Sequence, residues 1–351
     1  FAGLAIVSYL MVLAWNEDYH QQPVAATEMA QAPASNAGVS GNGDSMVLSG
    51  EASGDHPEEF VTPETSPSVA ASGTDTTAAV DNPYVTVRTD VFEIVINRVS
   101  GNIVESSLLQ YDASLNSNTP LKLLTHSANR TYLLESGLIG KNGPDSRANG
   151  EAPVYEVSRS EYTLDDGQDQ LAVDLSYTTD QGVRIIKRYE FQRDSYEIGV
   201  KYLIENRSEQ PWQANFTGKI VRDESPDPTS QASMGIQAFL GMVMSSPEDP
   251  YEKFSLKDLA EKRVNQQVTN GWLAFLQHYF LTAWIPDRDT PAQFQTTRRG
   301  PLHVMGFVYP ATTVAPGETA EVGARAYVGP KIIDRLEAVA PNLDRTVDFG
   351  W

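Results

Sequence analysis

The sequence contains no cysteine among its 351 residues. This absence excludes disulfide bonds, a thiolate nucleophile and any zinc site built on cysteine. It does not identify the compartment, because an oxidising compartment permits disulfides without requiring them. Stability must come from apolar side chains, which make up 40% of the residues and suffice for one large core or two small ones.

Basic residues are scarce, since 26 Lys and Arg stand against 46 Asp and Glu and leave a formal net charge of -20. Contacts with a phosphate backbone need clustered Lys and Arg, so no nucleic acid partner is expected. The 5 histidines are scattered and show no i, i+4 pair of the kind that holds zinc on a helix. We therefore expect no metal site.

Sequence motifs of enzyme chemistry are missing too. There is no G-x-S-x-G nucleophile elbow, and the glycine-rich stretch 137–143 lacks the spacing of a phosphate-binding loop. Acidic pairs such as Asp165 and Asp166 lie beside turn residues, where solvated carboxylates are expected. A glycosidase pair that meets only in space is the alternative. We expect no enzyme, no catalytic residue and no cofactor.

The longest uncharged apolar run is residues 1–15, FAGLAIVSYLMVLAW. It is shorter than the roughly 20 residues that span a bilayer, and the sequence begins without an initiator Met. We interpret residues 1–20 as a truncated transmembrane anchor, with Trp15 and Tyr19 at the level of the lipid headgroups. A cleaved signal peptide and a buried core helix are the alternatives.

Residues 21–80 contain eight acidic residues, no Lys or Arg, and few large apolar side chains. Such a segment cannot bury enough surface to offset its ordering entropy, so we expect a disordered acidic linker. Its root-mean-square reach would be on the order of 45 Å. The first basic residue is Arg88, so the flank lacks the Lys/Arg excess of a cytoplasmic loop, and the main domain should face outward.

From residue 81 the pattern becomes period two, as in Leu171, Val173, Leu175 and Tyr177, which alternate with polar residues. The pattern predicts an antiparallel meander over 154–221. Further strands are expected at 84–97, 103–109, 131–136, 302–309 and 319–328. Because no βαβ alternation is present, a mainly β domain with sandwich architecture is predicted over 81–329. Short helices are expected at 255–262 and from Pro330 to Pro341.

Four stretches carry a resemblance to a known family. They are SGLIGKNGPDSRANGEAPVY at 136–155, SSPEDPYEKF at 245–254, the GW…QHYF…TAWIP run at 271–286, and VAPNLDRTVDFGW at 339–351. On these residues the chain resembles the YidC/Oxa/Alb family of bacterial membrane-protein insertases, specifically the first transmembrane helix and large periplasmic domain of YidC. The resemblance extends over roughly 83–351.

The resemblance implies a β-supersandwich related to the galactose-mutarotase fold, in the periplasm, on an insertase and chaperone of the bacterial inner membrane. It implies that the parent protein helps inner-membrane proteins to insert and fold, alone or with the Sec translocon, without nucleotide or metal. The implied partners are SecDF, the Sec translocon and nascent membrane proteins, together with the bilayer through the N-terminal helix.

The resemblance also points to two partner surfaces. The region that aligns with the family's contact to SecDF lies at 223–270, and within it we assign Asp223, Glu224, Tyr251 and Phe254 as partner contacts. The alternative is a polar loop and edge strand without a partner.

The second surface is the closing segment 330–351, which in the family leads to the second membrane helix. Its apolar stripe, Ile332, Ile333 and Leu336, either packs on the domain or meets a partner.

A rival hypothesis is a periplasmic module of mutarotase-like fold that binds a carbohydrate or another extended ligand. Fold does not carry function across such folds, because chemistry depends on placed side chains. A mutarotase-type site would need a His and Glu acid/base set, and the scattered histidines offer none that the sequence makes recognisable.

Overall fold

The computed structural model describes residue 60 and residues 82–114, 117–229 and 239–347. These belong to one compact unit, Gly54–Trp351. The predicted anchor over 1–20, and the predicted linker over 21–80 apart from Phe60, lie outside the described residues. Within the described part, no helix has the length and apolar character needed to cross a membrane.

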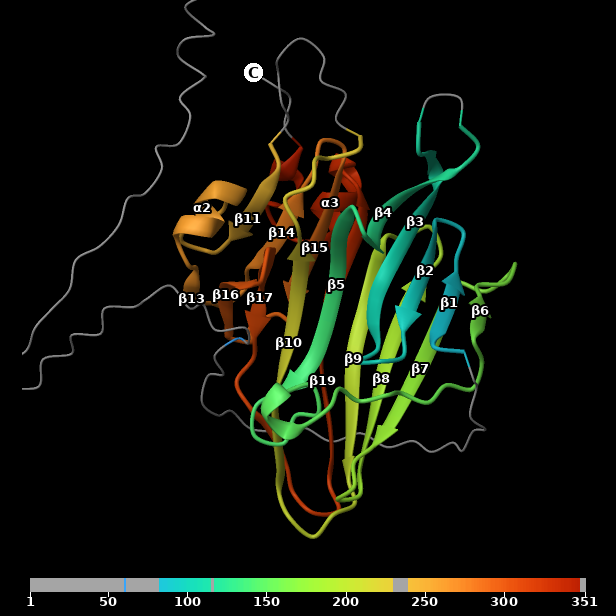
Figure 1. The fold of residues 1–351 in the computed structure, drawn as a ribbon, viewed down its shortest axis with the longest axis vertical. Coiled ribbons are helices and arrows are strands. Elements are labelled where there is room, and N and C mark those ends of the chain that lie inside the picture. The colour runs from blue at the N-terminus through green and yellow to red at the C-terminus, as the bar shows by residue number, and fades with distance from the viewer. Residues whose placement is uncertain (1–59, 61–81, 115–116, 230–238, 348–351) are drawn as a thin grey trace, which may run out of the picture. The chain divides into compact units, whose positions relative to one another are not determined.

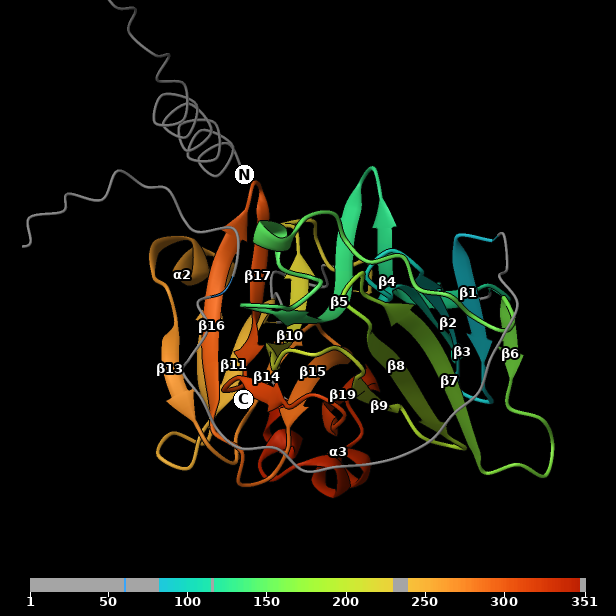
Figure 2. The ribbon, with the colours of Figure 1, turned by 90° about the horizontal axis from the view of Figure 1, so that it is seen from below.

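The fold consists of two β-sheets that lie as layers on each other (Figures 1 and 2). The larger sheet has 11 strands, and β18 joins it beside β10. In spatial order its strands are β13 (Asn265–Val268), β16 (Ala292–Arg299), β17 (Leu302–Val308), β10 (Trp212–Arg222), β5 (Arg130–Ile139), β4 (Pro120–Ser127), β3 (Asn102–Asp112), β2 (Phe92–Asn97), β1 (Tyr84–Arg88) and β6 (Glu161–Thr163), with β18 at Thr312–Val314.

The smaller sheet has 8 strands and is antiparallel throughout. In spatial order they are β12 (Glu252–Ser255), β11 (Gly241–Ser245), β14 (Trp272–Leu276), β15 (Phe280–Pro286), β19 (Thr319–Pro330), β9 (Glu197–Asn206), β8 (Val183–Gln192) and β7 (Gln170–Thr178). The predicted mainly β sandwich is therefore confirmed.

In the part of the chain that the structure describes, helices are few and short. They are α2 (Leu256–Glu261), α3 (Ile333–Val339) and two 3-10 turns, η1 (Arg147–Asn149) and η2 (Leu343–Thr346). Ser255 caps α2 as predicted, because its side chain accepts from the backbone N–H of Asp258, whose own carboxylate accepts from the Ser255 N–H. Figure 2 shows α2 beside β13 and β16, and α3 on the side of the smaller sheet away from β17.

Two details of the sequence prediction are wrong. The predicted meander over 154–221 holds for β7, β8 and β9, but β10 leaves the smaller sheet and pairs with β5 and β17 in the larger one. Alternation sets which face of a strand is buried and carries no information on which sheet the strand joins. The last helix begins at Ile333 because Pro330 still pairs with Phe280 at the end of β19.

The core between the sheets depends on strict alternation. In β9 the side chains of Ile198, Val200, Tyr202 and Ile204 are fully buried, while the residues between them are partly exposed. The predicted core run at 271–286 forms β14 and β15, whose residues are all buried. Burial on one face of each sheet thus joins the two layers.

An aromatic cluster at the centre requires a glycine. The rings of Phe216, Trp284 and Phe307 lie 5.7–6.5 Å apart. A Cβ at Gly218 of β10 would meet Phe307 and Trp284 ring atoms at 2.7 Å. The Trp284 Nε1–H also donates to the Lys219 carbonyl of the opposite sheet at 3.1 Å. The indole therefore fits only because residue 218 has no side chain.

We predict that Gly218→Ala lowers the free energy of unfolding by about 1–3 kcal/mol, because the methyl group overpacks this cluster. The matched control is Gly199→Ala in β9, where the new Cβ would meet only side-chain atoms of the partly exposed Glu190, Oε2 at 3.0 Å and Cβ at 3.1 Å. That change should cost less than about 1 kcal/mol, because the Glu190 side chain can move toward solvent. Urea unfolding followed by circular dichroism measures both, and an equal loss in the two variants would contradict the packing argument.

Candidate functional site

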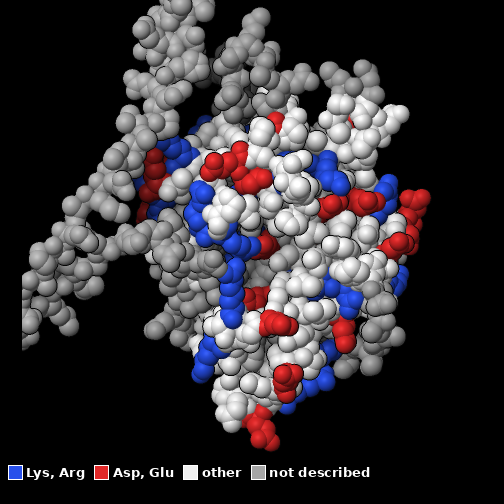
Figure 3. Space-filling view, in the orientation of Figure 1, with Lys and Arg blue, Asp and Glu red and all other residues white. Residues whose placement is uncertain are grey.

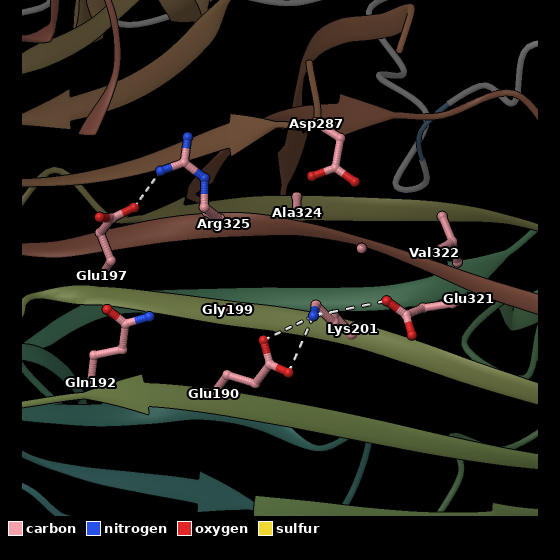
Figure 4. Close-up of a pocket in the computed structure, with 11 residues that line it drawn as sticks. Glu190, Gln192, Glu197, Gly199, Lys201, Asp287, Glu321, Val322, Ala324 and Arg325 are labelled. Carbon is pink, nitrogen blue, oxygen red and sulfur yellow. Dashed lines mark hydrogen bonds and ion pairs between the residues drawn. The ribbon is translucent and has the colours of Figure 1, made fainter. Parts of the chain in front are cut away.

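A charged groove of about 460 Å³ lies on the outer face of the smaller sheet (Figure 4). Because alternate residues of β8, β9 and β19 fill the core, the residues between them face outward and line this groove. Gly199 and Gly323 have no side chain and leave its floor open. The lining residues are Glu190, Gln192, Glu197, Gly199, Lys201, Asp287, Glu321, Val322, Gly323, Ala324 and Arg325.

The two cations of the groove are already paired with carboxylates. Lys201 Nζ lies 3.0 Å from a carboxylate oxygen of Glu190 and 3.8 Å from one of Glu321. Arg325 forms an ion pair with Glu197, and its other Nη donates to the Val339 carbonyl at 3.1 Å. These pairs are partly exposed, so each contributes about 0–1 kcal/mol to stability.

Several side-chain types that commonly act in catalysis are missing from the lining of the groove. Its lining contains no histidine and no hydroxyl or thiol nucleophile. Burial raises the pKa of the Asp287 carboxyl, which lines the groove together with the carboxylates of Glu190, Glu197 and Glu321. Over the described ranges, no group of three His, Asp or Glu side chains could hold a metal ion. The carboxylates, the lysine and the arginine of the lining are groups that can hydrogen-bond a polar ligand.

Asp223, a predicted partner residue, has a structural role. Its carboxylate accepts from the Thr131 N–H at 2.8 Å and from the Ser225 hydroxyl at 2.7 Å, and it pairs with Arg222. Although burial acts to raise it, these hydrogen bonds and the Arg222 charge hold the pKa of Asp223 below its usual value. Asp223 therefore fixes the end of β10.

Glu224, its predicted neighbour, points to solvent with 60% of its side chain exposed. A carboxylate oxygen lies 2.9 Å from His303 Nε2 and 3.6 Å from Arg298 Nη1. The hydrogen bond from His303 lowers the pKa of Glu224, and the Arg298 charge adds to this effect. Glu224 is therefore an oriented, ionised and accessible carboxylate.

Tyr251 and Phe254, also predicted as partner contacts, lie at β12, the edge strand of the smaller sheet. Both are partly buried and pack against the core. The Lys253 ammonium lies 5.4 Å from the Tyr251 ring centre and 5.1 Å from that of Phe239. An edge strand has unpaired backbone groups that another strand can meet.

The predicted apolar stripe of the closing segment divides between core and surface. Leu336 is fully buried and Ile333 is partly buried, so these two residues pack on the domain. Ile332 is 37% exposed and borders an apolar cleft of about 560 Å³. Tyr279, the most exposed large apolar residue described, is 57% exposed and lines the same cleft.

The cleft brings the two predicted surfaces together, because Pro228 and Thr229 of the first also line it. Asp227 holds this stretch in place by accepting from Gln277 Nε2 at 3.0 Å and from the His278 N–H at 2.8 Å. The remaining lining comes from Tyr111, Asp112, Ala113, Ser114, Leu121, Phe280, Pro330 and Lys331. No spacing in the sequence could have placed these segments side by side.

The sequence analysis did not predict that Lys187 is buried between the sheets. Lys187 of β8 is fully buried, and its Nζ donates to the Ser100 and Ser136 carbonyls at 2.9 Å each and to Asn102 Oδ1 at 3.3 Å. Burial pulls the pKa of Lys187 well below its ordinary value, while the Asp145 carboxylate acts to raise it. These acceptors belong to the larger sheet and its β2–β3 turn, so Lys187 connects the two sheets.

Arg222 was missed in the same way. It is fully buried at the end of β10, with Cζ 5.5 Å from the ring centres of both Tyr132 and Phe275. Both cations stand where alternation calls for an inward apolar residue, Lys187 after Ile185 and Arg222 after Ile220. The sequence did contain a signal for both residues, because each is a basic residue at a strand position whose alternation pattern faces the core.

The chain was compared with known proteins. The profile of the YidC periplasmic domain family matches residues 84–351. The membrane protein insertase YidC of Marinobacter nauticus is 67% identical over 351 residues, which is 100% of this chain and 61% of that protein. The protein of the same name from Hahella chejuensis is 47% identical over 356 residues, covering 99% of this chain and 61% of that protein. The chain thus spans about three-fifths of the length of these relatives.

Solved structures give a weaker likeness. A galactose mutarotase related enzyme from Lactobacillus acidophilus aligns with a TM-score of 0.44 at 8% identity, over 70% of this chain and 97% of that one. A putative aldose 1-epimerase from Escherichia coli aligns with a TM-score of 0.40 at 12% identity, over 70% of this chain and 98% of that one. Likenesses at this level carry no information about ligand or activity.

We predict that Lys187→Met lowers the free energy of unfolding by about 2–5 kcal/mol, because two buried carbonyls lose their donor. The matched control is Lys201→Met on the adjacent strand, where the lysine faces outward and the loss should be about 0–1 kcal/mol. Urea unfolding at neutral pH measures both. A Lys187→Met chain as stable as its control would show that the ammonium is not needed between the sheets.

Proposed function

The chain belongs to the YidC family of membrane protein insertases, and on this premise we propose that it forms the periplasmic part of such an insertase in the bacterial inner membrane. Its role there is to assist the insertion and folding of membrane proteins. The observation that carries the proposal is the 67% identity with an insertase along all 351 residues. The match of the periplasmic-domain profile to residues 84–351 supports the periplasmic location.

The proposed role is non-catalytic. It is supported by the groove on the smaller sheet, whose lysine and arginine are paired with carboxylates and whose lining lacks histidine. A domain that binds partners without catalysing a reaction needs exposed surfaces that complement those partners. The described residues form two such surfaces, an apolar cleft and the edge strand β12 of the smaller sheet. The alternative of a carbohydrate-binding module stays a prediction, since the sugar-enzyme likeness has a TM-score below 0.5.

The apolar cleft at Tyr279 and Ile332 is proposed to hold an apolar segment of a nascent membrane protein. Membrane-spanning segments are rich in large apolar side chains. Moving such side chains from water onto an apolar protein surface is favourable. Phe280 and Leu121 line the cleft, and Lys331 lies at its border. A cleft of about 560 Å³ has room for a few such side chains and not for a whole helix.

The test of the cleft is photo-cross-linking in the full-length insertase, with a photoreactive phenylalanine analogue in place of Tyr279. During synthesis of a single-span membrane protein, this position should cross-link to the nascent chain. The same analogue at Asp166, in an exposed turn between β6 and β7, is the control and should give only background. Equal cross-linking from both positions would contradict a specific cleft.

SecDF and the Sec translocon are the proposed protein partners, through the region 223–270. The support is geometric, because this region combines the accessible carboxylate of Glu224 with the edge strand β12 and the partly buried rings of Tyr251 and Phe254. An edge strand can add a strand from a partner, and a charge at the rim contributes to partner choice.

We predict that Glu224→Lys reduces co-purification of SecDF with the full-length insertase about tenfold, which corresponds to about 1.4 kcal/mol of binding free energy. The reversal places a lysine beside Arg298 and His303 and changes the sign of the accessible charge. Asp166→Lys makes the same charge change at an exposed turn and should leave co-purification unchanged. Undiminished recovery of SecDF with Glu224→Lys would place the contact elsewhere.

A further inference from the structure

Phe60 is a buried aromatic residue inside a segment whose composition predicts no packing. Its side chain is only 4% exposed. It belongs to an apolar cluster with Ile139 of β5, Val221 of β10, and Val304 and Val308 of β17, and this cluster is separate from the main core. The expectation of an unpacked linker does not hold at this residue, because a complementary apolar surface lies on the sheet.

The pairing register places this surface on the outer face of the larger sheet. Ile220 points into the main core, so its neighbour Val221 points outward. Val221 pairs with Val304 on one side and with Leu133 on the other, which forms an apolar row across three strands. Such a row on a solvent-facing side needs a cover, and Phe60 is the member of the described cluster that does not come from a strand.

The next row of the same face contributes a cation that contacts the ring. Two positions along β10, Lys219 pairs with Gly306 of β17 and with Glu135 of β5. Lys219 Nζ lies 5.4 Å from the centre of the Phe60 ring. An ammonium over an aromatic face is attracted by the ring electrons. Phe60 is thus held by apolar contact and by a cation.

The surroundings carry both basic and acidic side chains. A depression of about 210 Å³ beside the cluster is lined by Arg147, Lys219 and Arg299 and by the carboxylates of Glu135 and Asp145, and it shares Lys219 and Ile139 with the Phe60 cluster. Arg299 is paired with Glu135. Figure 3 shows Lys and Arg side chains in a stripe on this face, with Asp and Glu side chains beside them. In the sequence, Glu58 and Glu59 precede Phe60 within a segment that has no basic residue. The burial of Phe60 in the cluster and its contact with Lys219 therefore identify this segment as the occupant.

We propose that the outer face of the larger sheet is a docking site for an acidic segment with one aromatic residue, and that the chain's own Phe60 occupies it. Docking divides residues 21–80 at Phe60. Phe60 is thereby a point at which this segment is attached to the sheet.

The absence of cysteine makes a direct test possible, because a single introduced thiol can be labelled without background. In the full chain, Val304→Cys places a thiol in the Phe60 cluster, and it should react slowly with maleimide. Adding Phe60→Ala should raise the labelling rate about tenfold or more, since labelling follows exposure of the thiol. Phe60→Leu should retain most of the protection.

Two controls separate docking from general loosening. Met46→Ala removes another large apolar side chain of the same segment and should leave the rate at Val304→Cys unchanged. Val200→Cys reports on the core between the sheets and should stay unreactive with or without Phe60→Ala. An unchanged rate at Val304→Cys after Phe60→Ala, or an equal increase after Met46→Ala, would overturn the proposal.

A second measurement keeps the test decisive if Phe60→Ala unfolds the domain. In a chain with both Phe60→Cys and Val304→Cys, a short thiol cross-linker should join the two sites within one molecule. The pair Met46→Cys and Val304→Cys should not be joined in the same time. Equal cross-linking of both pairs, or of neither, would show that Phe60 has no preferred site on the sheet.

Discussion

The two sheets depend on one charged side chain that lies between them. The hydrophobic contact between the two sheets has no preferred direction and does not fix their relative position. The Lys187 ammonium, in contrast, needs hydrogen-bond acceptors at defined positions. It finds them at Ser100 and Ser136 on the opposite sheet, and the Tyr189 and Tyr202 rings lie 5.6 and 5.4 Å from Nζ. Burying an ammonium costs several kcal/mol, so any sliding of one sheet that removed these acceptors would be opposed strongly.

Much of the fold could be predicted from the sequence, because strand alternation is a local property. The predicted strands at 84–97, 302–309 and 319–328, and the Ser255 cap, appear in the structure. The sheet to which β10 belongs could not be predicted, since that choice depends on the partners β5 and β17. Proline at 330 suggested a helix start, yet the same residue closes β19 by pairing with Phe280.

The candidate site was less predictable, because its parts meet across long sequence separations. The family resemblance indicated the regions around Glu224 and Ile332, but not that Pro228 and Ile332 border one cleft. Leu336, which belongs to the same apolar stripe as Ile332, turns into the core. Phe60 offered a local signal, a single large ring in a polar segment, whose meaning depended on the outer row at Val221 and Val304.

The inward placement of Lys187 and Arg222 also changes what the protein presents to its surroundings. Both belong to the 26 basic residues counted in the net charge of -20, but both are fully buried. Neither cation contributes to the solvent-facing surface, and the buried carboxylate of Asp227 offsets one of these two charges. Lys187 and Arg222 are therefore not available to an anionic partner in solution.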